Sequence, residues 1–210
     1  DSPGGTAVGS PELSKKIYEA REAKPIVAVS NAEMDSAAYW IASAASKVFV
    51  TPSSSTGSIG VWSAASEVSK AMEANGVKVH VWRSQGSPSK APFLPYAAFT
   101  EEAIAHEQTQ VDQIYGEFIS AVARNRGVTV NAAQKAFGQG KSFMGKDAVE
   151  AGLADRVSSL EEVVARMQGG KLTHGAMENM DAAFAEPIQP VEPDESWRDW
   201  NETARLRSRL

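Results

Sequence analysis

The sequence predicts an α/β domain over residues 1–170, followed by a tail over residues 171–210. Short apolar runs of strand length alternate along the chain with longer segments of helical periodicity. Proline, glycine and Asn-Gly pairs stand between these segments. With 210 residues and 42% hydrophobic content, the chain can also bury a core. Strands that alternate with helices favour βαβ units with right-handed crossovers.

The predicted helices begin with Ser10-Pro11-Glu12, which places proline in the first helical turn, where its missing N–H has no cost. The segment 36–45 is rich in small residues, and the segment 62–74 ends at Asn75-Gly76, a left-handed stop signal. The longest pattern is amphipathic and runs from Thr100 to Arg126. We expect helices over residues 10–23, 36–45, 62–74, 100–126, 131–137, 145–151 and 159–168.

The predicted strands are short and apolar. "PIVAVS" (25–30) is a buried run, "KVFVTP" (47–52) ends at a proline, and "VKVHVW" (77–82) alternates with period two. Two further strands are expected near Ser142 and Arg156. The segment 84–95 contains three prolines and one glycine, which indicates a loop of the kind that often carries function.

Composition excludes several classes of function. There is no cysteine, and the three histidines at 80, 106 and 174 lack ligand spacing, so we expect no metal site and no cofactor. The formal charge of −5 argues against a nucleic-acid partner. No apolar run approaches the roughly 20 residues of a membrane span, and no signal peptide is visible.

The two ends of the sequence differ from its centre. "DSPGG" at residues 1–5 lacks a methionine and resembles a turn that follows a strand, so we expect at least one strand upstream. Residues 175–210 hold eight acidic and four basic residues, so they carry −4 of the formal charge. Within this tail, "ESWRDWNETARLRSRL" has the spacing of a short helix. Two hypotheses stay open for the tail: an unstructured terminus, or a peptide that docks on a neighbouring protein.

Ser36 follows an acidic break after the first strand and precedes two alanines and a helix. An ordinary N-cap serine is one interpretation of this position. The other is a nucleophile, because a helix N-terminus presents free N–H groups to an oxyanion. Ala37 and Ala38 leave the approach to the hydroxyl open.

Five segments occur in an order and spacing that support the second interpretation: "SPGG" (2–5), "DSAAYWIASAASKVFVTP" (35–52), "TGSIGV" (56–61), a lysine in the later loop, and "SFMGKDAVEAGLADRV" (142–157). Together they resemble peptidase family S49, the signal peptide peptidase A family, in the branch of phage capsid-assembly proteases. The resemblance covers roughly residues 1–168. It implies a Clp-protease-like or crotonase-like fold with a ββα spiral core.

The resemblance also implies roles for individual residues. Ser36 matches the nucleophile, and Lys90 in "GSPSKAP" matches the general base. Gly4 and Gly5 match a diglycine that forms an oxyanion hole, and Ser58 matches a hydroxyl that orients the lysine.

Chemistry independently favours a lysine base, because no histidine lies where a Ser-His-Asp triad would place one. A lysine base must lose roughly 3 units of pKa to work near neutral pH, and we expect residues 91–94 to provide the burial. Other candidates have simpler interpretations. Lys47 is expected to interact with the end of the preceding helix, His106 to lie on the surface, and Asp35 to point away from the oxyanion.

Alanine replaces the family's glycine at positions 37 and 38, which narrows the backbone approach for a substrate strand beside the nucleophile. The resemblance implies a cytoplasmic ring of subunits in which serine and lysine come from neighbouring copies, with the helix 100–126 as a packing element. The predicted function is hydrolysis of scaffold and capsid polypeptides. Alternatives are degradation of membrane-derived peptides, a non-catalytic scaffold whose tail binds capsid subunits, and an enoyl-CoA hydratase-like enzyme.

Overall fold

The computed structural model describes residues 1–170, 172, 173 and 184. The chain divides into two compact units, residues 1–159 and 160–210. The predicted tail, including its short helix, lies outside the described residues apart from positions 172, 173 and 184, and the boundary at residue 170 stays a prediction.

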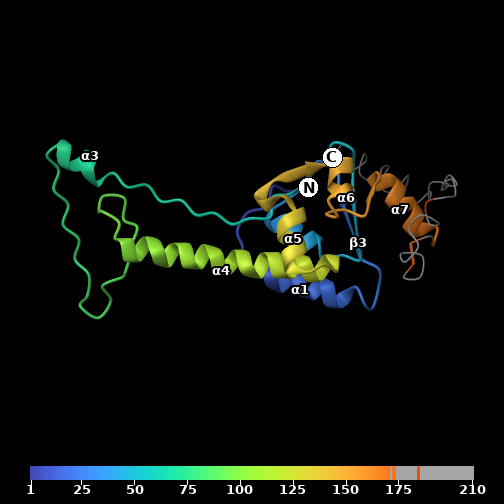
Figure 1. Ribbon diagram of the computed structural model, residues 1–210, viewed down its shortest axis with the longest axis horizontal. Helices are drawn as coiled ribbons and strands as arrows, with labels where there is room; N and C mark the ends of the chain where they lie inside the picture. Colours follow the sequence, from blue (N-terminus) through green and yellow to red (C-terminus); the bar gives the residue numbers. More distant parts are fainter. Residues whose placement is uncertain (171, 174–183, 185–210) are drawn as a thin grey trace, which may run out of the picture. The chain divides into compact units, whose positions relative to one another are not determined.

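Helices and strands are interspersed along the described residues, although strands also follow one another directly and helices come in succession, so the predicted alternation holds only in part (Figure 1). The helices are α1 (Ser10–Ala20), α2 (Ala37–Ala42), α3 (Ser69–Ala74), α4 (Glu101–Arg126), α5 (Val130–Ala136), the 3-10 helix η1 (Gly138–Gly140), α6 (Gly145–Glu150) and α7 (Leu160–Gln168). The strands are β1 (Val27–Ser30), β2 (Glu33–Asp35), β3 (Lys47–Val50), β4 (Ser55–Gly57), β5 (Ser142–Met144) and β6 (Arg156–Val157). The mixed α/β class is confirmed.

The strands form two small sheets. In the first sheet β3 lies between β1 and β6, and all three strands are parallel. In the second sheet β4 lies between β2, to which it is parallel, and β5, to which it is antiparallel. The chain therefore passes from the first sheet to the second twice, from β1 to β2 and from β3 to β4. The Clp-like spiral stays a prediction.

The N-terminal residues attach to the second sheet. Ser2 donates its N–H to the carbonyl of Glu33 (2.6 Å) and accepts from the N–H of Asp35 (3.1 Å). These bonds form a parallel bridge between Ser2 and Met34. The bridge brings the diglycine of "SPGG" alongside the end of β2, which is also where Ser36 begins the turn into α2.

The core lies where α2 meets α4. Trp40 of α2 stacks on Phe118 of α4 with ring centroids 4.6 Å apart and the planes 6° from parallel. Phe49 of the central strand β3 is fully buried. In α4 the buried residues, from Phe118 to Asn125, all belong to the C-terminal half of the helix. This stack fixes the position of α2 and therefore of the turn that precedes it.

A buried cluster of polar groups ties the end of α4 to the sheets. Arg126 Nη1 lies 2.8 Å from Asp155 Oδ2, and Lys47 Nζ lies 3.6 Å from Asp155 Oδ1. The Tyr39 hydroxyl donates to the carbonyl of Leu153 (2.7 Å). Lys47 thus pairs with Asp155, whereas the sequence placed it against the end of the preceding helix.

Two predictions for the segment 61–100 are wrong. Residues 77–82 form no strand, and the helix predicted over 62–74 covers Ser69–Ala74 alone. A strand requires a neighbour for its N–H and C=O groups, and none of the described strands pairs with residues 77–82. Trp82 is 86% exposed and Trp62 is 84% exposed, so the apolar pattern meets no core among the described residues. Figure 1 shows this segment, with α3, leading away from the sheets and returning at α4.

Tyr39 gives the fold a predictable sensitivity to alkali. Burial raises the pKa of its hydroxyl above the ordinary value of 10.0. The unfolded state then releases this proton first, so the stabilisation is complete below about pH 10 and is lost as the pH rises further. Tyr39→Phe should be about 1 kcal/mol less stable at pH 7, because the Leu153 carbonyl loses its donor, but should lose less stability above pH 10. Urea unfolding of both proteins between pH 7 and pH 11 measures this, and parallel pH curves would contradict it.

Candidate active site

Ser36 lies on a strained turn between β2 and α2. Its φ and ψ are 54° and −125°, a conformation that is rare for any residue other than glycine. Its N–H donates to the carbonyl of Gly57 (2.9 Å), and its carbonyl accepts from the N–H of Trp40 (3.0 Å). A serine at such a sharp strand-to-helix turn presents its hydroxyl outward, the geometry of a nucleophile elbow.

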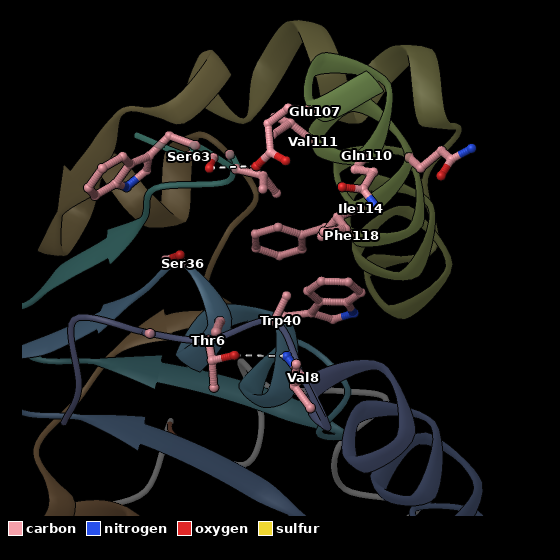
Figure 2. Close-up of a pocket in the computed structure, with 17 residues that line it drawn as sticks. Thr6, Val8, Ser36, Trp40, Ser63, Glu107, Gln110, Val111, Ile114 and Phe118 are labelled. Atoms are coloured by element: carbon pink, nitrogen blue, oxygen red, sulfur yellow. Dashed lines mark hydrogen bonds between the residues drawn. The ribbon is translucent and has the colours of Figure 1, made fainter. Parts of the chain in front are cut away.

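The side chain of Ser36 does not cap α2, although the residue occupies the N-cap position. Ser36 is half-buried and lines a cavity of about 520 Å³ (Figure 2). The ordinary interpretation of this serine as a helix cap therefore fails, and the hydroxyl stays available to a ligand in the cavity.

Gly4 touches the backbone of the Ser36 turn. Its φ is 98°, and a Cβ added there would lie 2.6 Å from Ser36 Cβ and 2.8 Å from the carbonyl oxygen of Asp35. No side chain fits into that space. The glycine at position 4 is thus required by the close packing of the two segments.

The oxyanion donors predicted from the sequence differ in availability. The Gly4 N–H donates to Ser2 Oγ (3.2 Å). Gly5 and Ala37 both line the cavity beside Ser36. Ala37 is the first residue of α2, where a helix leaves its N–H groups without an internal partner. Gly5 and Ala37 are consequently the better placed of the three predicted residues for stabilising an anion at this cavity.

Four segments of the chain line the cavity. Residues 5–8 and α2 form one side, residues 60–63 another, and α4 a third. Trp40, Val111, Ile114 and Phe118 make much of this wall apolar. No sequence pattern distinguishes the part of α4 that lies here, because its residues belong to one apolar stripe of an amphipathic helix.

Ser58 and Asp35 also lie close to the turn. Ser58 follows Gly57, whose carbonyl holds the Ser36 N–H, and its own N–H donates to Lys141 O (3.0 Å). Asp35 is 6% exposed, and its carboxylate oxygens accept from the hydroxyls of Ser55 (2.7 Å) and Ser142 (2.9 Å). The structure therefore brings Ser36, Gly4, Gly5, Ala37 and Ser58 together.

Lys90 is not part of this group. It is exposed in the segment 61–100 and is absent from the described residues that line the cavity. Its carbonyl accepts from Arg83 Nε (2.6 Å), and residues 92–94 are half-buried without enclosing the lysine. The burial expected from residues 91–94 is absent within one copy, and the role of Lys90 stays a prediction.

The remaining candidates carry no site. His106 is exposed on α4, as predicted, and His80 is exposed beside the Trp82 ring, with centroids 5.8 Å apart. Within the described residues, no three metal-ligating side chains gather. No helix in this part of the chain has both the length and the apolar character needed to cross a membrane.

These features define a class of site: a serine hydroxyl on a strained turn, beside backbone N–H groups and an open cavity, suited to attack on a carbonyl carbon. The family model of Peptidase family S49 matches residues 19–173. The chain belongs to peptidase family S49, which confirms the resemblance found in its motifs.

Individual relatives include phage proteins. Capsid assembly protease C of Escherichia phage lambda is 30% identical over 184 residues, covering 82% of this chain and 41% of that protein. Head-tail preconnector protein GP5 of Enterobacteria phage P21 is 32% identical over 167 residues, covering 80% and 32% respectively. A Synechocystis protein with a provisional protease name is 32% identical over 166 residues, covering 77% and 57%. The aligned part of the chain thus covers about half or less of the length of these relatives.

Gly4→Ala should block the site without unfolding the protein. The added Cβ displaces the Ser36 turn, so we expect labelling of Ser36 by a fluorophosphonate to slow at least a hundredfold. Gly116→Ala on α4 is the matched control, because a Cβ there meets nothing within 4 Å and alanine favours helix by up to about 1 kcal/mol. Mass spectrometry gives the labelling rates and thermal unfolding gives the stabilities. Equal labelling of the two variants would contradict the close packing described for Gly4.

Proposed function

We propose that the chain is a serine endopeptidase that hydrolyses extended polypeptides through a Ser36/Lys90 dyad. The observation that carries this proposal is the Ser36 turn, where a hydroxyl that does not cap its own helix faces a cavity shared with Gly5 and Ala37. Membership of a peptidase family supports the reaction class. Ser58, next to the carbonyl that holds the Ser36 N–H, is the residue we propose to orient the lysine.

The chemical steps follow from these groups. Ser36 Oγ attacks the substrate carbonyl while the neutral amine of Lys90 accepts its proton. The oxyanion receives hydrogen bonds from the N–H groups of Gly5 and Ala37. The intermediate collapses to an acyl-enzyme as the lysine returns the proton to the leaving amine. Water then attacks the ester carbonyl while its proton passes to Lys90. The ester bond breaks as Lys90 returns that proton to Ser36 Oγ, and the carboxylic acid product leaves.

We propose that the lysine is supplied by a neighbouring copy in a ring. A general base must come within hydrogen-bond reach of the hydroxyl, and Lys90 lies outside the Ser36 cavity of its own copy. The segment 61–100 that carries Lys90 exposes Trp62 and Trp82, which is the type of surface that a second subunit covers. We assign helix α4 to the same packing.

The names of two phage relatives support scaffold and capsid proteins as substrates. We further propose that residues 171–210 bind such proteins. Relatives named for signal peptide peptidase and for protease 4 favour a second candidate, the degradation of membrane-derived peptides. A non-catalytic scaffold is the alternative from another class, and it requires no reactive Ser36.

Mixing inactive variants tests the dyad and its origin together. Ser36→Ala and Lys90→Ala should each reduce casein cleavage at least a thousandfold, because each removes a group that acts on the reacting atoms. Lys90→Ala should unfold at the wild-type temperature, since Lys90 is exposed. Mixed oligomers of the two variants should recover a fraction of the wild-type rate, because some sites then contain an intact serine and an intact lysine.

Each outcome is informative. Full cleavage by Lys90→Ala would exclude the dyad, and absence of recovery in verified mixed oligomers would place both groups in one copy. A wild-type oligomer that neither cleaves casein nor forms a fluorophosphonate adduct on Ser36 would favour the scaffold alternative.

A further inference from the structure

One charged side chain reaches the cavity beside Ser36. Among the described residues that line this cavity, Glu107 of α4 is the one acidic residue, and there is no basic residue. The neighbouring wall is apolar. It includes the stacked rings of Trp40 and Phe118 and the side chain of Val111, one helical turn from Glu107 (Figure 2). A carboxylate in such surroundings loses part of its hydration and gains from a nearby positive charge.

That positive charge is not supplied by the described residues. Glu107 is half-buried, and its Oε1 accepts a hydrogen bond from Ser63 Oγ (2.7 Å). No ion pair to Glu107 is found within the described part of the chain. The half-buried carboxylate of Asp155 differs, since it contacts both Arg126 and Lys47. The cavity therefore contains an acidic group that is held in place but not neutralised.

Glu107 also stands at the junction of two cavities. A second cavity of about 420 Å³ shares Val61, Trp62, Ser63, Glu107 and Val111 with the first. Beyond this junction its wall is again apolar and includes Phe93, Phe99 and Ile104. The two cavities therefore adjoin beside α4, and we call the pair the groove. Ser36 lines the first cavity, and Glu107 lines both.

The distance along the helix sets the scale of this groove. Glu107 precedes Phe118 by 11 residues, which is about 16 Å of α-helix. An extended polypeptide covers about 16 Å in roughly five residues. A substrate strand attacked by Ser36 can therefore place a side chain at Glu107 from a position within about five residues of the scissile bond.

We propose that Glu107 is a specificity residue that binds a lysine or arginine side chain of the polypeptide substrate. The apolar wall accommodates the aliphatic stem of that side chain, and the carboxylate binds its charged end. An acidic substrate side chain at the same position is disfavoured by like-charge repulsion. This inference deepens the proposed peptidase function and rests on it for the identity of the ligand as a polypeptide.

A peptide scan in two formats tests the proposal. A set of peptides carries lysine, leucine or glutamate at one position at a time, over five positions on each side of the cleavage site. Cleavage is measured with wild type, Glu107→Gln and Glu107→Lys, and affinity is measured by fluorescence anisotropy in a Ser36→Ala background. Glu102→Gln is the matched control, because it removes the same charge from the same helix at an exposed position outside both cavities.

At one position we expect lysine to exceed leucine about tenfold in kcat/KM and in affinity, as a charged hydrogen bond provides. Glu107→Gln should reduce that ratio to below about twofold, Glu107→Lys should reverse the preference towards glutamate, and Glu102→Gln should keep the wild-type ratio. The preference should weaken at high salt.

Failure of this inference is distinguishable from failure of the peptidase function. Cleavage without any lysine preference overturns the inference and leaves the peptidase intact. So does a Glu107→Gln variant that is slowed equally on lysine, leucine and glutamate peptides, since Glu107 would then act on the enzyme and not on a substrate charge. A lysine preference in affinity without cleavage supports the inference and overturns the peptidase. Absence of both binding and cleavage overturns both.

Discussion

The backbone of Ser36 is the constraint on which the site depends. A serine at φ 54° and ψ −125° costs on the order of 1–3 kcal/mol, so its surroundings must hold it there. The Gly57 carbonyl accepts a hydrogen bond from the Ser36 N–H, and Gly4 packs against the Ser36 Cβ. The second sheet and the N-terminal bridge at Ser2 thus have a clear role, since they bring both partners to one turn. Short strands suffice because their task is register, not the burial of large side chains.

The two halves of helix α4 have different roles. Its C-terminal half packs against α2 and α1 and ends at Arg126, whose guanidinium contacts Asp155. Its N-terminal half exposes Ile104 and borders the groove. A single amphipathic stripe therefore supplies the core at one end of the helix and, in the proposed function, a surface for another polypeptide at the other end. The stack of Trp40 on Phe118 joins these two parts and lies one helical turn beyond Ser36.

Sequence periodicity predicted the elements that bury apolar side chains. It failed for elements whose position does not depend on apolar burial. The strand β3 and the C-terminal half of α4 bury apolar side chains, and both lie where the apolar pattern predicted them. The strands β2 and β4 have only three residues each and are largely polar, so they show no periodicity from which they could be predicted. Residues 77–82 have the alternation of a strand, but none of the described strands pairs with them. The order of the motifs predicted Ser36, Gly4 and Ser58 as site residues. Glu107 was not predicted, because in the sequence it resembles any acidic residue on the exposed face of a helix.

If the dyad is divided between copies, as proposed, the free-energy cost of a neutral lysine can be offset by burial of the exposed tryptophans. A lysine that acts as a base near pH 7 requires a pKa lowered by roughly 3 units, which costs about 4 kcal/mol. At about 25 cal/mol per Å², burial of about 160 Å² of apolar surface offsets that cost. Trp62 and Trp82 are 84% and 86% exposed, and a tryptophan buries on the order of 200 Å². Covering these two side chains would therefore contribute a term larger than the cost of neutralising one lysine, and the rest of the interface must offset the lost translational and rotational freedom. Under the proposal of a shared dyad, the site is active only where subunits have assembled, so peptide hydrolysis depends on the oligomeric state.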